Sequence, residues 1–74
     1  MVLDQWSWFE RYTEACRHVL DGRRTLETHR KLIAKEKAQG RDTKSSEDLL
    51  ASLERTQIIF EDDLKRIRRQ FGFN

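Results

Sequence analysis

Apolar residues recur at alternating intervals of four and three residues along two long stretches of this chain. The first stretch carries Trp8, Tyr12, Ala15, Val19, Gly22, Leu26, His29 and Ile33. The second stretch carries Leu50, Leu53, Gln57, Phe60, Leu64, Ile67 and Phe71. This spacing aligns one side of an α-helix over many turns, as in helices that pack lengthwise against each other. The chain contains no proline, so both stretches can form continuous helices.

The segment between the two stretches has the residues of a tight reversal. Gly40 suits the left-handed backbone position that often follows a helix. Candidate N-caps of the second helix are Asp42, Thr43 and Ser45. We therefore predict one domain over residues 1–74, an all-α antiparallel hairpin with long helices at about 5–39 and 44–71.

The start and the interior of the first helix each leave two alternatives. Asp4 is the favoured N-cap, and Ser7 in a capping box with Glu10 is the alternative. Gly22 lies inside the apolar series, where glycine costs about 1 kcal/mol relative to alanine in a helix. The helix is either continuous or kinked at Gly22, and we expect it to be continuous.

The two apolar series come into register when they are paired outward from the turn. The opposed pairs are Ile33 and Leu50, His29 and Leu53, Leu26 and Gln57, Gly22 and Phe60, Val19 and Leu64, Ala15 and Ile67, and Tyr12 and Phe71. In this register Gly22 gives room to the bulky Phe60. Leu49 is expected to widen the apolar side of the second helix, and His29 to be partly buried.

The charges of the chain alternate in blocks. Net charge is −2 over residues 1–22, +5 over 23–41, −5 over 42–63 and +4 over 64–74. Folding the chain back near residue 41 sets the +5 block beside the −5 block. Each exposed ion pair contributes only about 0–1 kcal/mol. The pattern therefore favours the antiparallel arrangement more than it stabilises it.

No residues have the spacing of an active site or a metal site. Cys16 is the single cysteine, which fits a reducing cytoplasm. His18 and His29 do not share a helix face, and the three consecutive acids at 61–63 point about 100° apart along a helix. We expect a non-enzyme without metal or cofactor, with these acids solvated. Without a long apolar run or a signal peptide, we expect it in the cytoplasm.

Several apolar residues lie off the paired series. A second stripe on the first helix contains Phe9, Cys16 and Leu20, with Trp6 beyond it, while Ile58 and Ile59 lie on opposite flanks of the second helix. The N-terminal aromatic residues can cap the open end of the hairpin, the stripe can join two hairpins into a four-helix dimer, or it can bind another protein. The predicted anchors of partner binding are Trp6, Trp8, Phe9, Cys16, Leu20, Ile58 and Ile59. The predicted polar rim is Arg23, Arg24, Arg66, Arg68 and Arg69.

Basic residues form two clusters that could contact phosphates. One lies over residues 23–37 and the other is the K-R-I-R-R segment at 65–69. The clusters lie at opposite ends of the predicted rod, and the first faces the acidic block. Nucleic-acid binding is therefore the less favoured alternative.

The segment from Arg17 to Leu53 resembles a group of small helical-hairpin proteins of alphaproteobacteria, often rhizobial. The resemblance lies in R-H-V with Gly22, in H-R-K-L-I at 29–33, in G-R-D-T at 40–43 and in L-L-x-x-L-E at 49–54. It covers about half of the chain. Size and helical character are also similar to the QseM-type antiactivators of mesorhizobia, which bind transcriptional activators of quorum sensing and conjugative transfer.

The similarity to the QseM-type antiactivators implies a stoichiometric inhibitor that covers a surface of a DNA-binding activator. We therefore expect a small regulatory protein that binds and inhibits a partner protein, with a transcriptional activator as the favoured partner. The alternatives are a structural hairpin that self-associates as a homodimer, and a basic protein that binds nucleic acid directly.

Overall fold

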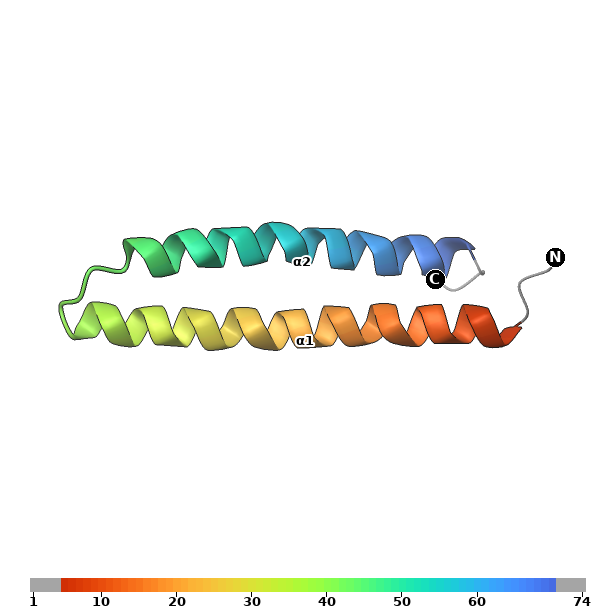
Figure 1. Ribbon diagram of the computed structural model, residues 1–74, viewed down its shortest axis with the longest axis horizontal. Coiled ribbons are helices and arrows are strands. Elements are labelled where there is room, and N and C mark those ends of the chain that lie inside the picture. The colour runs from red at the N-terminus through yellow and green to blue at the C-terminus, as the bar shows by residue number, and fades with distance from the viewer. Residues whose placement is uncertain (1–4, 71–74) are drawn as a thin grey trace.

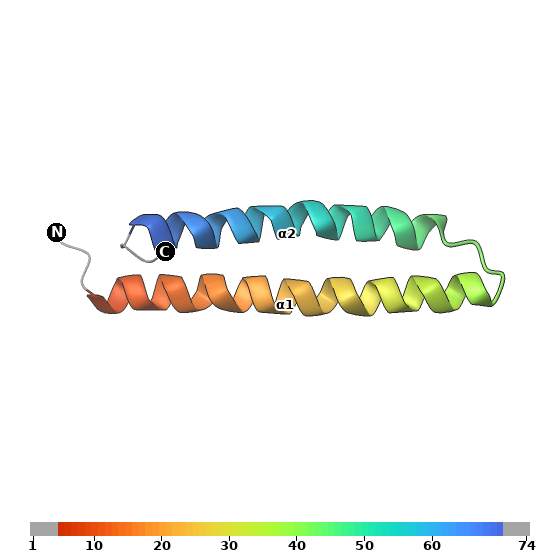
Figure 2. The ribbon, with the colours of Figure 1, turned by 180° about the vertical axis from the view of Figure 1, so that it is seen from behind.

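The computed structural model describes residues 5–70, with side chains from Ser7 onward. Within this range the chain forms two helices, α1 (Gln5–Ala38) and α2 (Lys44–Gln70). They lie antiparallel and side by side (Figures 1 and 2), in a rod of 58 × 22 × 15 Å. The predicted all-α antiparallel hairpin is confirmed. Over these residues neither helix carries an apolar stretch long enough to cross a membrane.

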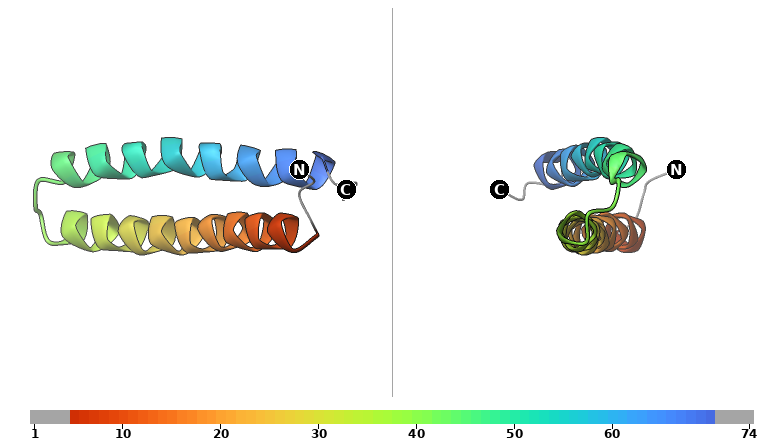
Figure 3. Two further views of the ribbon diagram at one scale, coloured as in Figure 1. Left: turned by 45° about the vertical axis from the view of Figure 1, so that its right-hand side comes forward. Right: turned by 90° about the vertical axis from the view of Figure 1, so that its left-hand side faces the viewer.

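The helix boundaries agree with the prediction within a residue where they can be compared. Helix α1 begins at Gln5, so Ser7 lies inside the helix and its role as N-cap is wrong. Asp4, the favoured cap, and Phe71, the predicted end of the second helix, lie outside the described residues. Helix α1 continues through Gly22 as one element, and Figure 3 shows α1 as one unbroken helix. The continuous helix that we expect at this glycine is therefore confirmed.

The end of α1 is closed by a Schellman motif. Gly40 has a φ of 75°, in the left-handed region that glycine adopts without strain. The Arg41 amide donates to the Glu36 carbonyl over 3.0 Å, and the Gly40 amide donates to the Lys37 carbonyl over 3.0 Å. These two bonds satisfy carbonyl groups that the end of a helix otherwise leaves free. Gly40 therefore has the predicted role.

Thr43 is the residue at the N-cap of α2. Its carbonyl accepts the first intrahelical hydrogen bond, from the Glu47 amide over 2.8 Å, and the residue is only 7% exposed. The Asp42 carboxylate supports the turn by accepting a bond from the Lys44 amide over 3.0 Å. Ser45 lies inside α2, so its role as N-cap is wrong. The apolar pattern alone does not distinguish the three candidates.

The core is a narrow seam between the helices. Its main cluster consists of Ala15, Val19, Leu64 and Ile67, and it lies toward the open end of the hairpin. Trp8, Tyr12, Cys16 and Phe60 are partly buried against this cluster. Nearer the turn, Leu26 and Ile33 are also buried. Every described side chain keeps about 2% or more of its surface exposed, as expected for two helices without a third layer.

Two details of the predicted seam are wrong. The space beside Gly22 is filled by the Gln57 side chain, while the Phe60 ring stacks on His18 with 5.0 Å between ring centroids. Gly22 therefore accommodates a polar amide and not an aromatic ring. Leu49 does not widen the buried side of α2, because it is 49% exposed. His29 is partly buried, as predicted.

Candidate functional site

A strip of surface, which we call a flank, borders the seam on each side. Along each flank, every seventh residue of a helix occupies the equivalent position. We define the ladder flank as Cys16, Arg23, Arg30 and Lys37 of α1 with Glu47, Glu54, Glu61 and Arg68 of α2. We define the His18 flank as Arg11, His18, Thr25 and Leu32 of α1 with Leu49, Thr56, Asp63 and Gln70 of α2. The right-hand view of Figure 3, along the rod, shows that no third element of the described chain covers either flank.

Ion pairs between the helices close the turn half of the ladder flank. Arg30 and Glu54 approach to 3.1 Å, and Lys37 and Glu47 to 2.8 Å. Arg23 makes a two-pronged pair with Glu61, in which Nε and Nη2 each donate over 2.9 Å to a different carboxylate oxygen. The +5 and −5 blocks therefore meet as predicted. Exposed pairs contribute about 0–1 kcal/mol each, so the ladder selects the register more than it stabilises the fold.

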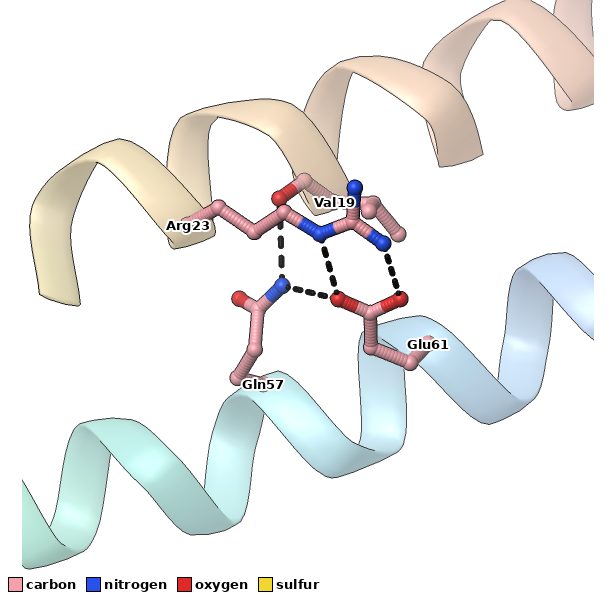
Figure 4. A network of polar contacts seen from close by, with 4 residues as sticks. All are labelled: Val19, Arg23, Gln57 and Glu61. Atoms are coloured by element: carbon pink, nitrogen blue, oxygen red, sulfur yellow. Dashed lines mark hydrogen bonds and ion pairs between the residues drawn. The ribbon is translucent and has the colours of Figure 1, made fainter. Parts of the chain in front are cut away.

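A buried amide extends the ladder into the seam (Figure 4). Gln57 is 7% exposed, and its Nε2 donates to the Val19 carbonyl over 3.1 Å and to Glu61 Oε2 over 2.8 Å. A Cβ on residue 22 would overlap Gln57 Oε1, so only glycine leaves room for this conformation of the amide. A buried amide without partners costs about 1–3 kcal/mol. A shift of register would separate these groups, and the network therefore fixes how the helices align.

The same contacts change the acidity of Glu61. The hydrogen bond from Arg23, followed by that from Gln57, lowers the pKa of the Glu61 carboxyl below its ordinary value. The hydrogen bond to Glu61 also raises the pKa of Arg23. Glu61 is thus not part of a solvated acidic face, contrary to the prediction, whereas Asp62 and Asp63 are exposed as predicted.

The His18 flank is apolar near the turn and charged near the open end. Leu32 and Leu49 are 51% and 49% exposed. Thr25 and Thr56 are exposed and uncharged in the middle of the flank. Toward the open end there is a groove of about 410 Å³ lined by Ala15, His18, Ile59, Phe60, Asp62, Asp63 and Arg66. Ile59 brings a large apolar side chain to this groove and is 66% exposed.

The predicted anchors do not form one patch. Trp8 is half-buried against the core, where the apolar series places it, and stacks on Tyr12 with 5.6 Å between ring centroids. Cys16 is also half-buried against the core. Phe9 and Leu20 are 51% and 57% exposed. Helix α1 includes Trp6, but the side chain of Trp6 lies outside the described part of the chain.

Phe9, Cys16 and Leu20 share one side of α1, and we call them the open-end stripe. Phe9 and Cys16 lie in the heptad row of the ladder flank, at its open end, and Leu20 lies beside that row. The two isoleucines of α2 are divided between the flanks. Ile58 lines a groove of about 440 Å³ with residues of the ladder flank, whereas Ile59 lines the groove on the His18 flank. The structure thus brings three of the predicted anchors together and separates the others.

The five arginines predicted as a rim have different surroundings. Arg23 is held by Glu61. Arg66 lines the groove on the His18 flank, and Arg68 lies in the heptad row of the ladder flank, level with Cys16. Arg24 and Arg69 are exposed. Of these five arginines, Arg68 is therefore the one placed to border the open-end stripe from α2.

Sequence reasoning misses the roles of three residues. The apolar spacing places Gln57 in the seam but does not predict that its amide joins the two helices. The spacing also does not identify the exposed Leu32 and Leu49 as a pair. The available signal for the pair is the heptad: Leu32 follows His18 by 14 residues, and Leu49 precedes Asp63 by 14. For the Gln57 network, the available signal is that Gly22 and Gln57 both belong to the apolar series that face each other across the seam.

Among the described residues, no three histidine, cysteine or acidic side chains lie close enough to hold a metal ion. Comparison with known proteins gives no match to any family model, curated protein or solved structure. The candidate interaction surfaces of the described residues are therefore the two flanks and the open-end stripe.

Proposed function

We propose that this hairpin is a small non-enzymatic regulatory protein that binds a transcriptional activator through the open-end stripe and inhibits it. The supporting observation is the pair Phe9 and Leu20, large apolar side chains that are more than half exposed on one side of α1. Buried aromatic and aliphatic anchors with a bordering arginine are typical of the centre of a protein interface. Arg68 supplies that border from α2.

The proposed mechanism is stoichiometric coverage of a surface. Phe9 and Leu20 are 11 residues apart, or about 16 Å along a helix at 1.5 Å per residue. A stripe of this length fits the side of one helix or a shallow groove of the activator. Cys16, half-buried between them, continues the apolar surface into the hairpin core. The bound activator would then be unable to contact its own partner or promoter through the covered surface.

The ladder weighs against direct nucleic-acid binding. Arg23, Arg30 and Lys37, half of the basic cluster on α1, already pair with carboxylates of α2. Phosphate binding is driven by protein cations that displace the counterions condensed on the nucleic acid. Cations already neutralised within the chain contribute little to that displacement. A protein partner therefore fits the surface better than a nucleic acid.

The test uses Leu20→Glu with Ala34→Glu as its matched control. Ala34 is exposed on the same side of α1, two heptads nearer the turn. A tagged full-length chain is used for capture from a bacterial lysate with nuclease, at low and moderate salt. An activator recovered in this way is then purified and assayed in transcription from its own promoter with increasing amounts of each hairpin.

We expect one equivalent of the wild-type chain and of Ala34→Glu to silence the activator, while Leu20→Glu fails although circular dichroism shows full helicity. Capture without an effect on transcription would contradict inhibition. Equal inhibition by Leu20→Glu would exclude the open-end stripe. Recovery that is lost when nuclease is added would instead favour nucleic-acid binding.

A further inference from the structure

The hairpin exposes more surface than a compact protein of its mass. Its accessible surface is 6155 Å², against about 4,800 Å² expected for a compact monomer of 8.9 kDa. The excess of about 1,300 Å² exceeds the 800 Å² or so that each partner contributes to a standard protein interface. A rod with one narrow seam therefore has the spare surface that a lengthwise contact would cover.

We infer that a second copy of this chain docks on the His18 flank, with the two-fold axis parallel to the rod, and completes a four-helix bundle. The ladder flank is poorly suited to this contact, because its turn half is occupied by three ion pairs within the chain. The His18 flank offers uncharged residues over the same half. Its members there are Thr25, Leu32, Leu49 and Thr56.

The orientation follows from the order of residues along the flank. With the axis parallel to the rod, every level of the flank meets the same level of the partner, and α1 lies beside the partner's α2. Leu32 and Leu49 then meet the same two leucines of the second copy and form one apolar layer. Thr25 and Thr56 form the next layer. With a perpendicular axis through the threonines, the leucines would instead face the charged level of His18 and Asp63.

The polar side chains near the open end are self-complementary in this orientation. His18 on α1 lies opposite the partner's Asp63. Glu14, whose carboxylate also lies 3.5 Å from His18 Nε2 of its own chain, lies opposite the partner's Arg66. His18, Asp63 and Arg66 line one groove on this flank, and Glu14 shares a second groove with His18 and Asp63. Because of the two-fold axis, each of these contacts occurs twice in the dimer. Opposite charges that meet across an interface favour one pairing over its alternatives.

This dimer is independent of the proposed partner, because the open-end stripe lies on the other side of α1. Leu20→Glu should therefore prevent capture of the activator and leave the dimer intact. Failure of one proposal leaves the other standing.

The test exchanges charges between two variants of the full chain. Glu14→Arg places an arginine at position 14, opposite the partner's Arg66. Arg66→Glu places a glutamate at position 66, opposite the partner's Glu14. Each variant alone then meets like charges twice, while an equimolar mixture pairs opposite charges twice. The association constants are measured by sedimentation equilibrium, with circular dichroism to verify that the helices form.

We expect the wild-type chain to form a dimer. Each variant alone should have a dissociation constant at least about tenfold larger, which corresponds to about 1.4 kcal/mol of dimer stability. The equimolar mixture should recover the wild-type affinity. A wild-type chain that is monomeric at all concentrations would overturn the proposal. A mixture no tighter than its components would overturn the parallel axis.

A second pair of substitutions keeps the test informative if the charge variants unfold. Leu32→Glu with Leu49→Glu places four carboxylates in the proposed apolar layer, and both residues are about half exposed in the single hairpin. We expect this double variant to be a folded monomer, while Leu20→Glu remains a dimer. A dimeric double variant would overturn the proposal.

Discussion

The ladder flank and the His18 flank are built on the same heptad repeat, but they expose different side chains to the solvent. On the ladder flank, the charged rows of α1 and α2 meet as opposite charges and are paired within one chain. On the His18 flank, the equivalent rows place leucine level with leucine and threonine level with threonine. A charged row can be satisfied by one neighbouring helix and water, whereas an apolar row remains exposed until another surface covers it.

This difference separates what fixes the fold from what remains available for binding. The ladder and the Gln57 network specify which residues of α1 lie opposite which residues of α2. They leave the leucines of the His18 flank and the open-end stripe as the surfaces with apolar area to bury. Stability and recognition can therefore be changed independently.

The largest contrast is expected between the seam and its flanks. Ile67 is 3% exposed and Ile58 is 61% exposed, on the same helix. Ile67→Ala should lower the free energy of unfolding by about 2–5 kcal/mol, because it removes buried methyl groups and leaves a cavity. Ile58→Ala should change it by about 0.5 kcal/mol or less. Urea unfolding followed by circular dichroism measures both; similar losses would mean that Ile58 is covered.

A smaller effect is expected where the ladder enters the seam. With Gln57 present, Gly22→Ala pushes the amide away from the Val19 carbonyl, which offsets the gain of about 1 kcal/mol from better helix propensity. In a Gln57→Ala background, the same change should stabilise the hairpin by about 1 kcal/mol. We expect the double-mutant cycle to give a coupling of about 1–2 kcal/mol. A coupling near zero would mean that the amide does not occupy the space beside residue 22.

The smallest effect is a pH dependence confined to the ladder flank. The pKa of Glu61 is lower in the folded than in the unfolded chain, so the unfolded chain binds the proton first as the pH falls. The stability contributed by Glu61 is full above its ordinary pKa of 4.5 and is lost as the pH falls through the lower folded value. The wild-type chain should therefore lose more stability in acid than Glu61→Gln.

Arg23→Ala should reduce the same loss, because the bond from Arg23 is the largest cause of the shift. Urea unfolding at a series of pH values checks both variants, since urea does not screen charges as a salt would. Equal acid sensitivity in all three chains would show that the ion pair is absent in solution.

The fold was predictable from the sequence because its signals repeat. Each heptad of the seam, and each charge block, restates the same antiparallel arrangement, so an error at one position does not change the result. Gly40 was predictable for a different reason, since the left-handed end of a helix strongly favours glycine.

Details that depend on single side chains were not predictable. The N-cap of α2 fell on Thr43 among three suitable residues, and Gly22 accommodates Gln57 where a size argument favoured Phe60. Whether a residue such as Leu49 is buried depends on a small rotation of the helix, which the apolar spacing does not fix. In the candidate site, the spacing placed Phe9, Cys16 and Leu20 together and put Ile58 and Ile59 on opposite flanks. Only the structure shows that Ile59 is the one on the His18 flank.

The contrast between the two flanks is tested most directly by nuclear magnetic resonance of the ¹⁵N-labelled chain over a wide range of concentrations. Dilution should shift the amide signals around Thr25, Leu32, Leu49 and Thr56. The signals around Arg30 and Glu54 should stay in place, because the ladder pairs lie within one chain. Shifts confined to the ladder flank, or a spectrum that does not change with concentration, would contradict this account.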